Sequence, residues 1–215
     1  MSLCNEIPKA ASGSMTIILR TYYGNTQIGS DQYYYYTMNV PSSVVPTLSQ
    51  VTCSEYMSDV HNLIGAYVQN KSRLSLAIIG ATGSYGSVIT TYKISVAGQT
   101  INAVSGTTGI MTTSGNQTIT ATITDSRGRT ATKSISVNVL PYIHPKINGV
   151  GVERNTDTSA LVTANLLATS LIVNGIEKNF SRYMAPTIPG QFFSAFSHNY
   201  KKTFISAYYS DKKHW

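Results

Sequence analysis

The sequence predicts an all-β protein, and three observations support that prediction. Charged residues make up only 12% of the chain, whereas the exposed faces of helices are normally rich in Glu, Lys and Arg. Ser, Thr, Gly, Tyr and β-branched residues are abundant, which is typical of strands and turns. The segment Met38–Cys53 also aligns without a gap with Val137–Val152, at an offset of 99 residues. A repeat of this length is too long for a solenoid unit and indicates tandem β-sandwich domains.

The segment from Pro46 to Leu140 predicts one complete sandwich. Apolar and polar residues alternate through six or seven short segments, with turn signals about every ten residues. One polar face per segment predicts antiparallel sheets that are solvated on the outside. The residues expected to face the core are Leu74, Leu76, Ile78, Tyr92, Ile94, Val96, Ile119, Ala121, Ile123, Ala131, Ile135, Val137 and Val139.

The N-terminal region repeats only the final hairpin of that sandwich. Thr16–Leu19 aligns with Thr118–Ala121, and the connecting turn around Gly24-Asn25 and Gly29 is about three residues longer. Two strands alone are marginally stable in water, so we expect this hairpin to be the end of a larger domain. The residues of its last strand that we expect to point into the core are Tyr34, Tyr36, Met38 and Val40.

The predicted organisation therefore has one complete and two partial modules. Residues 1–45 form the partial first β-domain, 46–141 the complete sandwich and 142–180 the start of a third module. Alternation fails in residues 181–215, where we expect an irregular tail. We expect the chain to start and stop inside domains, as a fragment of a longer gene product.

The formal net charge of +7 suggests nucleic-acid binding, but the distribution of charge argues against it. Residues 46–145 contribute +3 and residues 180–215 contribute +4. The basic residues of the middle region are dispersed, and Arg127 and Arg129 flank a turn glycine. A nucleic-acid surface would gather such residues beside aromatic partners. We therefore expect a solvated surface and no nucleic-acid partner.

Cysteine use and hydropathy indicate synthesis in the cytoplasm. Cys4 and Cys53 are the only cysteines, and Cys53 aligns with Val152, so we expect a small buried apolar side chain and no disulfide framework. The first residues lack the pattern of a signal peptide. No apolar run approaches the length of a membrane span, so no membrane partner is expected.

No pattern of catalytic, cofactor-binding or metal-binding residues emerges, so an enzyme is not expected. Glu55, Asp59 and Asp125 are the only carboxylates of the middle module, and none lies in an apolar context that would raise its pKa. We expect Asp125 to cap the turn Asp125–Arg129. The glycine-rich segment Gly80–Gly86 lacks the Lys-Ser/Thr pair of a phosphate-binding loop. The four histidines, which lack metal-ligand spacing, are His61, His144, His198 and His214.

Four consecutive tyrosines, Tyr33–Tyr36, form the most unusual local string. In a strand, Tyr33 and Tyr35 would point to solvent. Outward tyrosines are candidates for surface contact, because their rings stack on sugars and bury area at low entropic cost. The alternatives are that they cover a contact between domains or simply favour a strand.

Three stretches carry a resemblance to a known family, and together they span roughly residues 13–155. They are TYYGNTQIGSDQYYYYTMNVPSSVVPTLSQVTCSE, LIGAYVQNKSRLSLAIIGATGSYGSVITTYKISVAGQTI and ITATITDSRGRTATKSISVNVLPY. In these stretches the sequence resembles the minor structural proteins of siphoviruses and of prophages in Gram-positive bacteria. The resemblance implies a virion tail or tail-tip component built from immunoglobulin-like modules, without known catalytic residues.

The resemblance also sets the expected partners. They are other phage tail proteins, with oligomers formed through the symmetry of the tail. The expected role is a non-catalytic spacer and surface-contact module. The alternative is a carbohydrate-binding module of a phage tail or bacterial adhesin, which would contact host cell-wall polysaccharide through the exposed tyrosines and glycine-rich loops.

Overall fold

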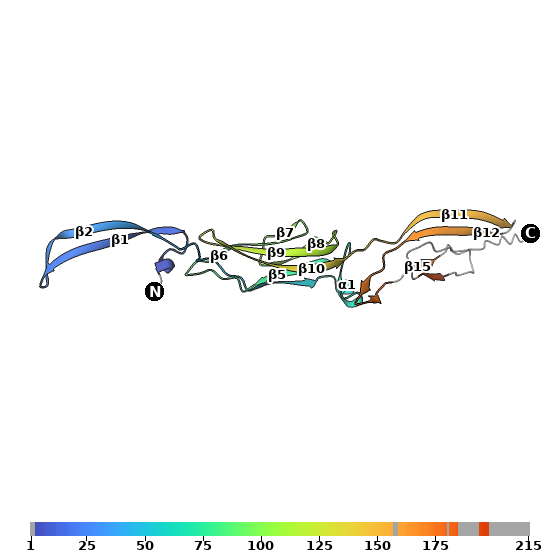
Figure 1. Cartoon of the computed structure of the whole chain (residues 1–215), viewed down its shortest axis with the longest axis horizontal. Helices are drawn as coiled ribbons and strands as arrows, with labels where there is room; N and C mark the ends of the chain where they lie inside the picture. Colours follow the sequence, from blue (N-terminus) through green and yellow to red (C-terminus); the bar gives the residue numbers. More distant parts are fainter. Residues whose placement is uncertain (1–2, 157–158, 180, 185–193, 198–215) are drawn as a thin grey trace, which may run out of the picture. The chain divides into compact units, whose positions relative to one another are not determined.

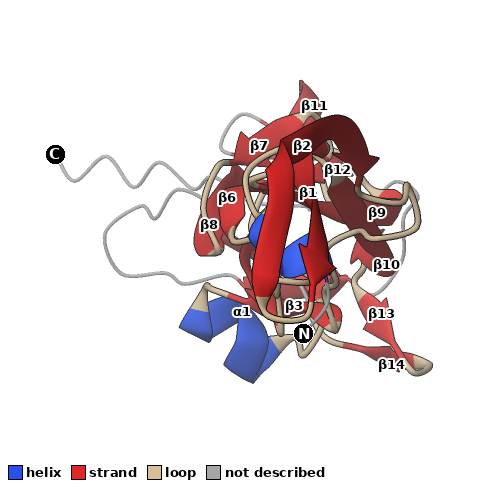
Figure 2. Ribbon diagram, turned by 90° about the vertical axis from the view of Figure 1, so that its left-hand side faces the viewer, coloured by secondary structure: helices blue, strands red, loops and turns tan. Residues whose placement is uncertain are grey.

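The computed structural model describes residues 3–156, 159–179, 181–184 and 194–197, and strands dominate it (Figure 1). Within these residues the helical segments are a single turn, η1 (Leu3–Glu6), and a short α-helix, α1 (Ser58–Leu63) (Figure 2). The sheets are built mainly from antiparallel pairs. The predicted all-β class is confirmed.

The chain separates into two compact units whose boundary runs through the predicted middle module. The first unit contains Met1–Ser54, Leu74–Gly109 and Gln117–Val137. The second contains Glu55–Arg73, Ile110–Asn116 and Asn138–Trp215. Each unit therefore combines segments that are distant in sequence.

The first unit holds a separate two-stranded hairpin and most of two larger sheets. The hairpin pairs β1 (Ser12–Tyr23) with β2 (Thr26–Asn39). One larger sheet has the order β3-β5-β8, and the other contains the run β10-β9-β6-β7. Their bounds are β3 (Gln50–Glu55), β5 (Arg73–Ile79), β6 (Ile89–Val96), β7 (Gln99–Ile101), β8 (Ser105–Ile110), β9 (Gly115–Asp125) and β10 (Thr130–Leu140).

Both larger sheets bury one apolar face, which is the arrangement of a two-layer sandwich. The inward residues expected on β5, β6 and β9 are buried, apart from the half-buried Tyr92. On the opposite face of β9 and β10, the hydroxyl oxygens of Thr120 and Ser134 lie 3.0 Å apart, as the predicted polar outer face requires. Period-2 alternation thus identified the buried face of β5, β6 and β9 correctly. On β10, Val139 is buried as expected, whereas Ala131, Ile135 and Val137 are only half-buried. The fully buried residues include Leu74, Ile94, Ile119, Ala121, Ile123 and Val139.

The second unit has a small core beside α1. Val60 of α1, Val68 of β4 (Tyr67–Val68) and Leu171 are buried together, and Tyr142 packs against them. The apolar stretch Leu63–Val68 ends in β4, and nothing in the pattern of the sequence indicated α1. The other strands of this unit are β11 (Lys146–Thr156), β12 (Ser159–Leu167), β13 (Ile172–Val173), β14 (Ile176–Glu177), β15 (Ser181–Met184) and β16 (Ser194–Ser197).

These last six strands form three separate antiparallel hairpins, β11-β12, β13-β14 and β15-β16. The hairpin β15-β16 falls inside the segment 181–215, for which an irregular tail was expected. Residues 185–193 and 198–215 of that segment lie outside the described residues.

Candidate functional site: the exposed β1–β2 hairpin

The β1–β2 hairpin follows directly from its local sequence. Its strands are rich in β-branched and tyrosine residues, which favour extended backbone. Gly24 and Asn25 form the two-residue turn between the paired residues Tyr23 and Thr26, and Gly24 has a φ of +59°. Glycine adopts this conformation without steric penalty, so the chain can reverse tightly here.

A β-bulge interrupts the hairpin near its tip. Between the pairs Leu19–Gln32 and Thr21–Ile28, Arg20 on β1 faces the segment 29–31 on β2. The extra residues expected in the connecting turn are therefore in this bulge, while the turn itself stays tight. Gly29 has a φ of +75°, which allows the strand to bend at this point.

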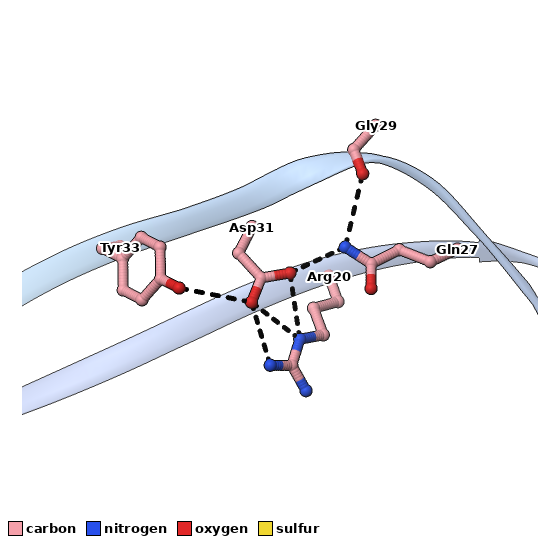
Figure 3. Close-up of polar contacts among 5 residues, drawn as sticks. All are labelled: Arg20, Gln27, Gly29, Asp31 and Tyr33. Atoms are coloured by element: carbon pink, nitrogen blue, oxygen red, sulfur yellow. Dashed lines mark hydrogen bonds and ion pairs between the residues drawn. The ribbon is translucent and has the colours of Figure 1, made fainter.

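The bulge is closed by a polar cluster on one face of the hairpin (Figure 3). Arg20 Nε and Nη2 donate to the Asp31 carboxylate at 2.9–3.0 Å, and Gln27 Nε2 donates to Asp31 Oδ1 at 2.7 Å. The Tyr33 hydroxyl donates more weakly to Asp31 Oδ2, at 3.4 Å. The hydrogen bonds from Arg20 and Gln27 lower the pKa of Asp31, and the bond to Asp31 raises the pKa of Arg20. The sequence pattern did not predict this cluster, because its members come together only through the register across the bulge.

The two tyrosines predicted as surface contacts, Tyr33 and Tyr35, lie on the same face as this cluster. Tyr33 pairs with Ile18 and Tyr35 with Thr16. Tyr33 is 52% exposed and Tyr35 is 76% exposed. Both side chains are therefore accessible, although only Tyr33 joins the polar cluster.

The opposite face departs from the prediction that its residues point into a core. Val40 is buried and Met38 is half-buried, as expected at the base of the hairpin. Tyr34 and Tyr36, however, are exposed, so their predicted burial is wrong. The physical reason is that β1 and β2 form a two-stranded sheet of their own, and no second layer of described residues buries Tyr34 and Tyr36.

At the base of the hairpin, Arg127 of the β9–β10 turn binds the N-terminal segment that precedes β1. The Arg127 guanidinium donates to the carbonyl oxygens of Ile7 at 2.8 Å, Cys4 at 2.8 Å and Ser84 at 2.6 Å, and also to that of Tyr85. Arg127 is only 8% exposed, so the solvated position expected for it is wrong. Its five fixed donors match a cluster of backbone acceptors that a lysine would not satisfy.

Arg129, on the other side of the same turn, binds the segment that follows β2. Its guanidinium donates to the carbonyl oxygens of Val40 and Pro41 at 2.6 Å, and also to that of Val44. Gly128, between the two arginines, has a φ of +77°. The signal in the sequence was the pattern Arg-Gly-Arg at a turn, but periodicity alone cannot identify the acceptors.

Asp125 holds this turn as predicted. Its Oδ1 accepts hydrogen bonds from the backbone N–H groups of Arg127 at 3.0 Å and Arg129 at 2.9 Å. Because Asp125 is also buried, its carboxylate fixes the backbone from which both arginines project. The capping role of Asp125 is therefore confirmed.

The remaining residues singled out in the sequence do not gather into a site. Cys4 and Cys53 are free thiols, and Cys53 is half-buried rather than fully buried. Among the described residues, no three His, Cys, Asp or Glu side chains group together as a metal site would require. His61 lies in α1 and the His144 ring makes an edge contact with Tyr142, whereas two further histidines, His198 and His214, lie outside the described residues.

The glycine-rich segment Gly80–Gly86 is a loop, and an isolated antiparallel β-bridge joins its residue Thr82 to Thr47. In the part of the chain that the structure describes, no helix is both long and apolar enough to span a membrane.

Comparison with known proteins places the chain in a family. No curated protein matches the sequence. Residues 1–191 match a family described as siphovirus protein of unknown function (DUF859). This match covers most of the 215 residues and includes the β1–β2 hairpin and the arginine-bound turn. The chain therefore belongs to this siphovirus protein family.

Proposed function

We propose that this phage protein is a non-catalytic structural component of the virion tail or tail tip, acting as a spacer and a surface for weak repeated contacts. Membership of a siphovirus family supports a phage role. The observation that carries the spacer role is the junction at the β9–β10 turn. There, Arg127 and Arg129 donate to backbone carbonyls of the segments before β1 and after β2.

Such a junction suits a spacer because it restricts the backbone on both sides of the hairpin. Hydrogen bonds from a charged donor contribute about 1.5–3 kcal/mol each when they are not exposed to competing water. Weak contacts made by one copy would gain strength through avidity when they are repeated around a symmetric tail. Other tail proteins are the expected partners.

Immunogold labelling of purified virions tests the location. Antibodies raised against the chain are expected to label the tail or its tip. Unlabelled tails, or labelling confined to the capsid, would contradict the proposal. A virion that lacks the gene product provides the control for antibody specificity.

A second candidate function is the binding of host cell-wall polysaccharide, favoured by the exposure of Tyr33 and Tyr35 on one face. Labelled protein is expected to bind isolated host cell walls, and the double change Tyr33→Ala with Tyr35→Ala is expected to abolish that binding. Tyr56→Ala removes a comparably exposed tyrosine outside the hairpin and serves as the matched control. Equal loss in both variants, or no binding by the unchanged protein, would contradict this candidate.

A further inference from the structure

We infer that the β1–β2 hairpin binds the same hairpin of a second copy of this chain, through the face opposite Tyr33 and Tyr35. We call this face the apolar face. It is defined by the register, because residues directly opposite in an antiparallel pair point to the same side. Its large apolar residues are Met15, Ile17, Leu19, Tyr23, Ile28, Tyr34, Tyr36 and Met38. The same register also places the uncharged polar residues Thr21, Thr26 and Gln32 on this face.

The apolar face is too large to be left in water without consequence. Its six most exposed side chains present roughly 800 Å² of surface, judged from their exposed fractions and typical side-chain areas. Monomeric proteins rarely expose contiguous apolar patches of more than about 300–600 Å². A stable interface buries about 800 Å² on each partner, so this face alone has the area that a dimer needs.

The sequence repeat indicates that this face has the pattern of a covered surface. Ile17 and Leu19 align with Ile119 and Ala121 of β9, and both β9 residues are fully buried in the sandwich. At the base of the hairpin the same face already begins to be covered. A Cβ on Gly13 would lie 3.1 Å from the buried Ile7 side chain. Beyond that base, nothing described in the chain covers it.

The distribution of charge permits a second copy as the partner. The residues of the apolar face carry no charge, so two identical faces can meet without repulsion. The charged groups near the tip, Arg20 and Asp31, are on the other face and are paired with each other. Two hairpins packed by their apolar faces form a small two-layer sandwich, with the sheets about 10 Å apart. Such pairing is isologous, and therefore closes at a dimer.

Sedimentation of the full chain over a range of concentrations tests the inference. The unchanged protein is expected to form a dimer with a dissociation constant of about 10 µM or tighter. Ile17→Lys would place two like charges in the interface and is expected to raise that constant at least about 100-fold. The matched control is Ile18→Lys, because Ile17 and Ile18 are neighbours of equal exposure, 46%, on opposite faces. Its dimerisation is expected to be unchanged.

Three outcomes would overturn the inference. These are a monomer at all concentrations, an equal loss of dimer in both lysine variants, and a trimer or larger assembly. Circular dichroism of each variant shows whether the β-structure is intact. If Ile17→Lys unfolds, a cross-linking experiment takes the place of that variant. Tyr34 is then replaced by the photo-crosslinking residue benzoylphenylalanine, and the same replacement of Tyr33 is the control. Cross-links between two copies are expected only from position 34, and they must map to β1 or β2 of the other copy.

The inference does not depend on where the protein sits in the virion. A chain that dimerises in solution but fails to label tails would retain the interface and lose the proposed function. A chain that labels tails but stays monomeric would lose only the interface.

Discussion

The β1–β2 hairpin and the β9–β10 hairpin share a sequence pattern but differ in their surroundings. Ile17 of β1 aligns with Ile119 of β9, yet Ile17 is exposed whereas Ile119 is fully buried. Only at the base do the two hairpins agree, since Val40 and Val139 are both buried. Alternation therefore encodes which face of a strand is apolar, while burial of that face depends on a second sheet.

The outer faces of the two hairpins differ as well. On β9 and β10 the outer face carries threonine and serine, with Thr122 and Thr132 in hydroxyl contact at 3.4 Å. On β1 and β2 the same parity carries Ile18, Tyr33 and Tyr35. The sandwich hairpin thus has one apolar and one polar face, whereas the free hairpin presents large side chains on both.

The largest expected effect comes from replacing the two aligned isoleucines, Ile119 and Ile17, by alanine one at a time. Ile119→Ala is expected to lower the free energy of unfolding by about 3 kcal/mol, because it leaves a cavity in a packed core. Ile17→Ala is expected to change it by about 0.5 kcal/mol or less in the monomer, where the side chain is exposed. Urea denaturation at low protein concentration measures both. An equal cost at the two positions would mean that the monomer itself covers the hairpin.

A second test breaks the junction. Arg127→Ala leaves buried carbonyl oxygens without a donor and is expected to cost about 2–3 kcal/mol. Limited proteolysis is expected to show faster cleavage in the segment 4–11, because Arg127 no longer holds it, while the segment 40–46 stays bound by Arg129. Arg127→Lys keeps the charge but not the planar set of donors, and is expected to restore only part of the stability. Full rescue by lysine would show that charge alone maintains the junction.

The two turn glycines give a smaller, matched effect. Gly24 and Gly128 both have positive φ angles, and a Cβ at either position would meet no neighbouring atom. Alanine at either position therefore introduces only backbone strain, of about 1 kcal/mol. Gly128→Ala is expected to lower the global stability measured by denaturation. Gly24→Ala is expected instead to speed amide hydrogen exchange near the hairpin tip alone, and a global effect would show that both hairpins unfold together.

The smallest expected effect is the dependence on pH of the stability of the hairpin at the bulge. Arg20 and Gln27 lower the pKa of Asp31 below its ordinary value of 3.8, so the folded hairpin binds the proton more weakly than the unfolded chain. The stabilisation is complete above the ordinary pKa and is lost as the pH falls through the lower folded value. Because the pair is at the surface, added salt is expected to weaken the effect. Amide exchange near Gln27, measured through acid titration, is expected to rise with acidity.

Asp31→Asn is the control for the acid titration, because it removes the titrating group. Its amide exchange is expected to lack the acid-dependent step after correction for intrinsic exchange rates. A step of the same size in this variant would assign the transition to another group.

The sequence by itself determined the β class, the buried parity of β5, β6 and β9 and the capping role of Asp125. These features are local, since a period of two and a turn signal depend on neighbours along the chain. Tertiary structure decided the burial of Arg127, the exposure of Tyr34 and Tyr36, and the position of the extra residues in a bulge. Each of these depends on contacts between distant segments, such as Arg127 with Cys4 or Arg20 with Asp31. Periodicity assigns a side chain to a face, but only the fold determines what meets that face.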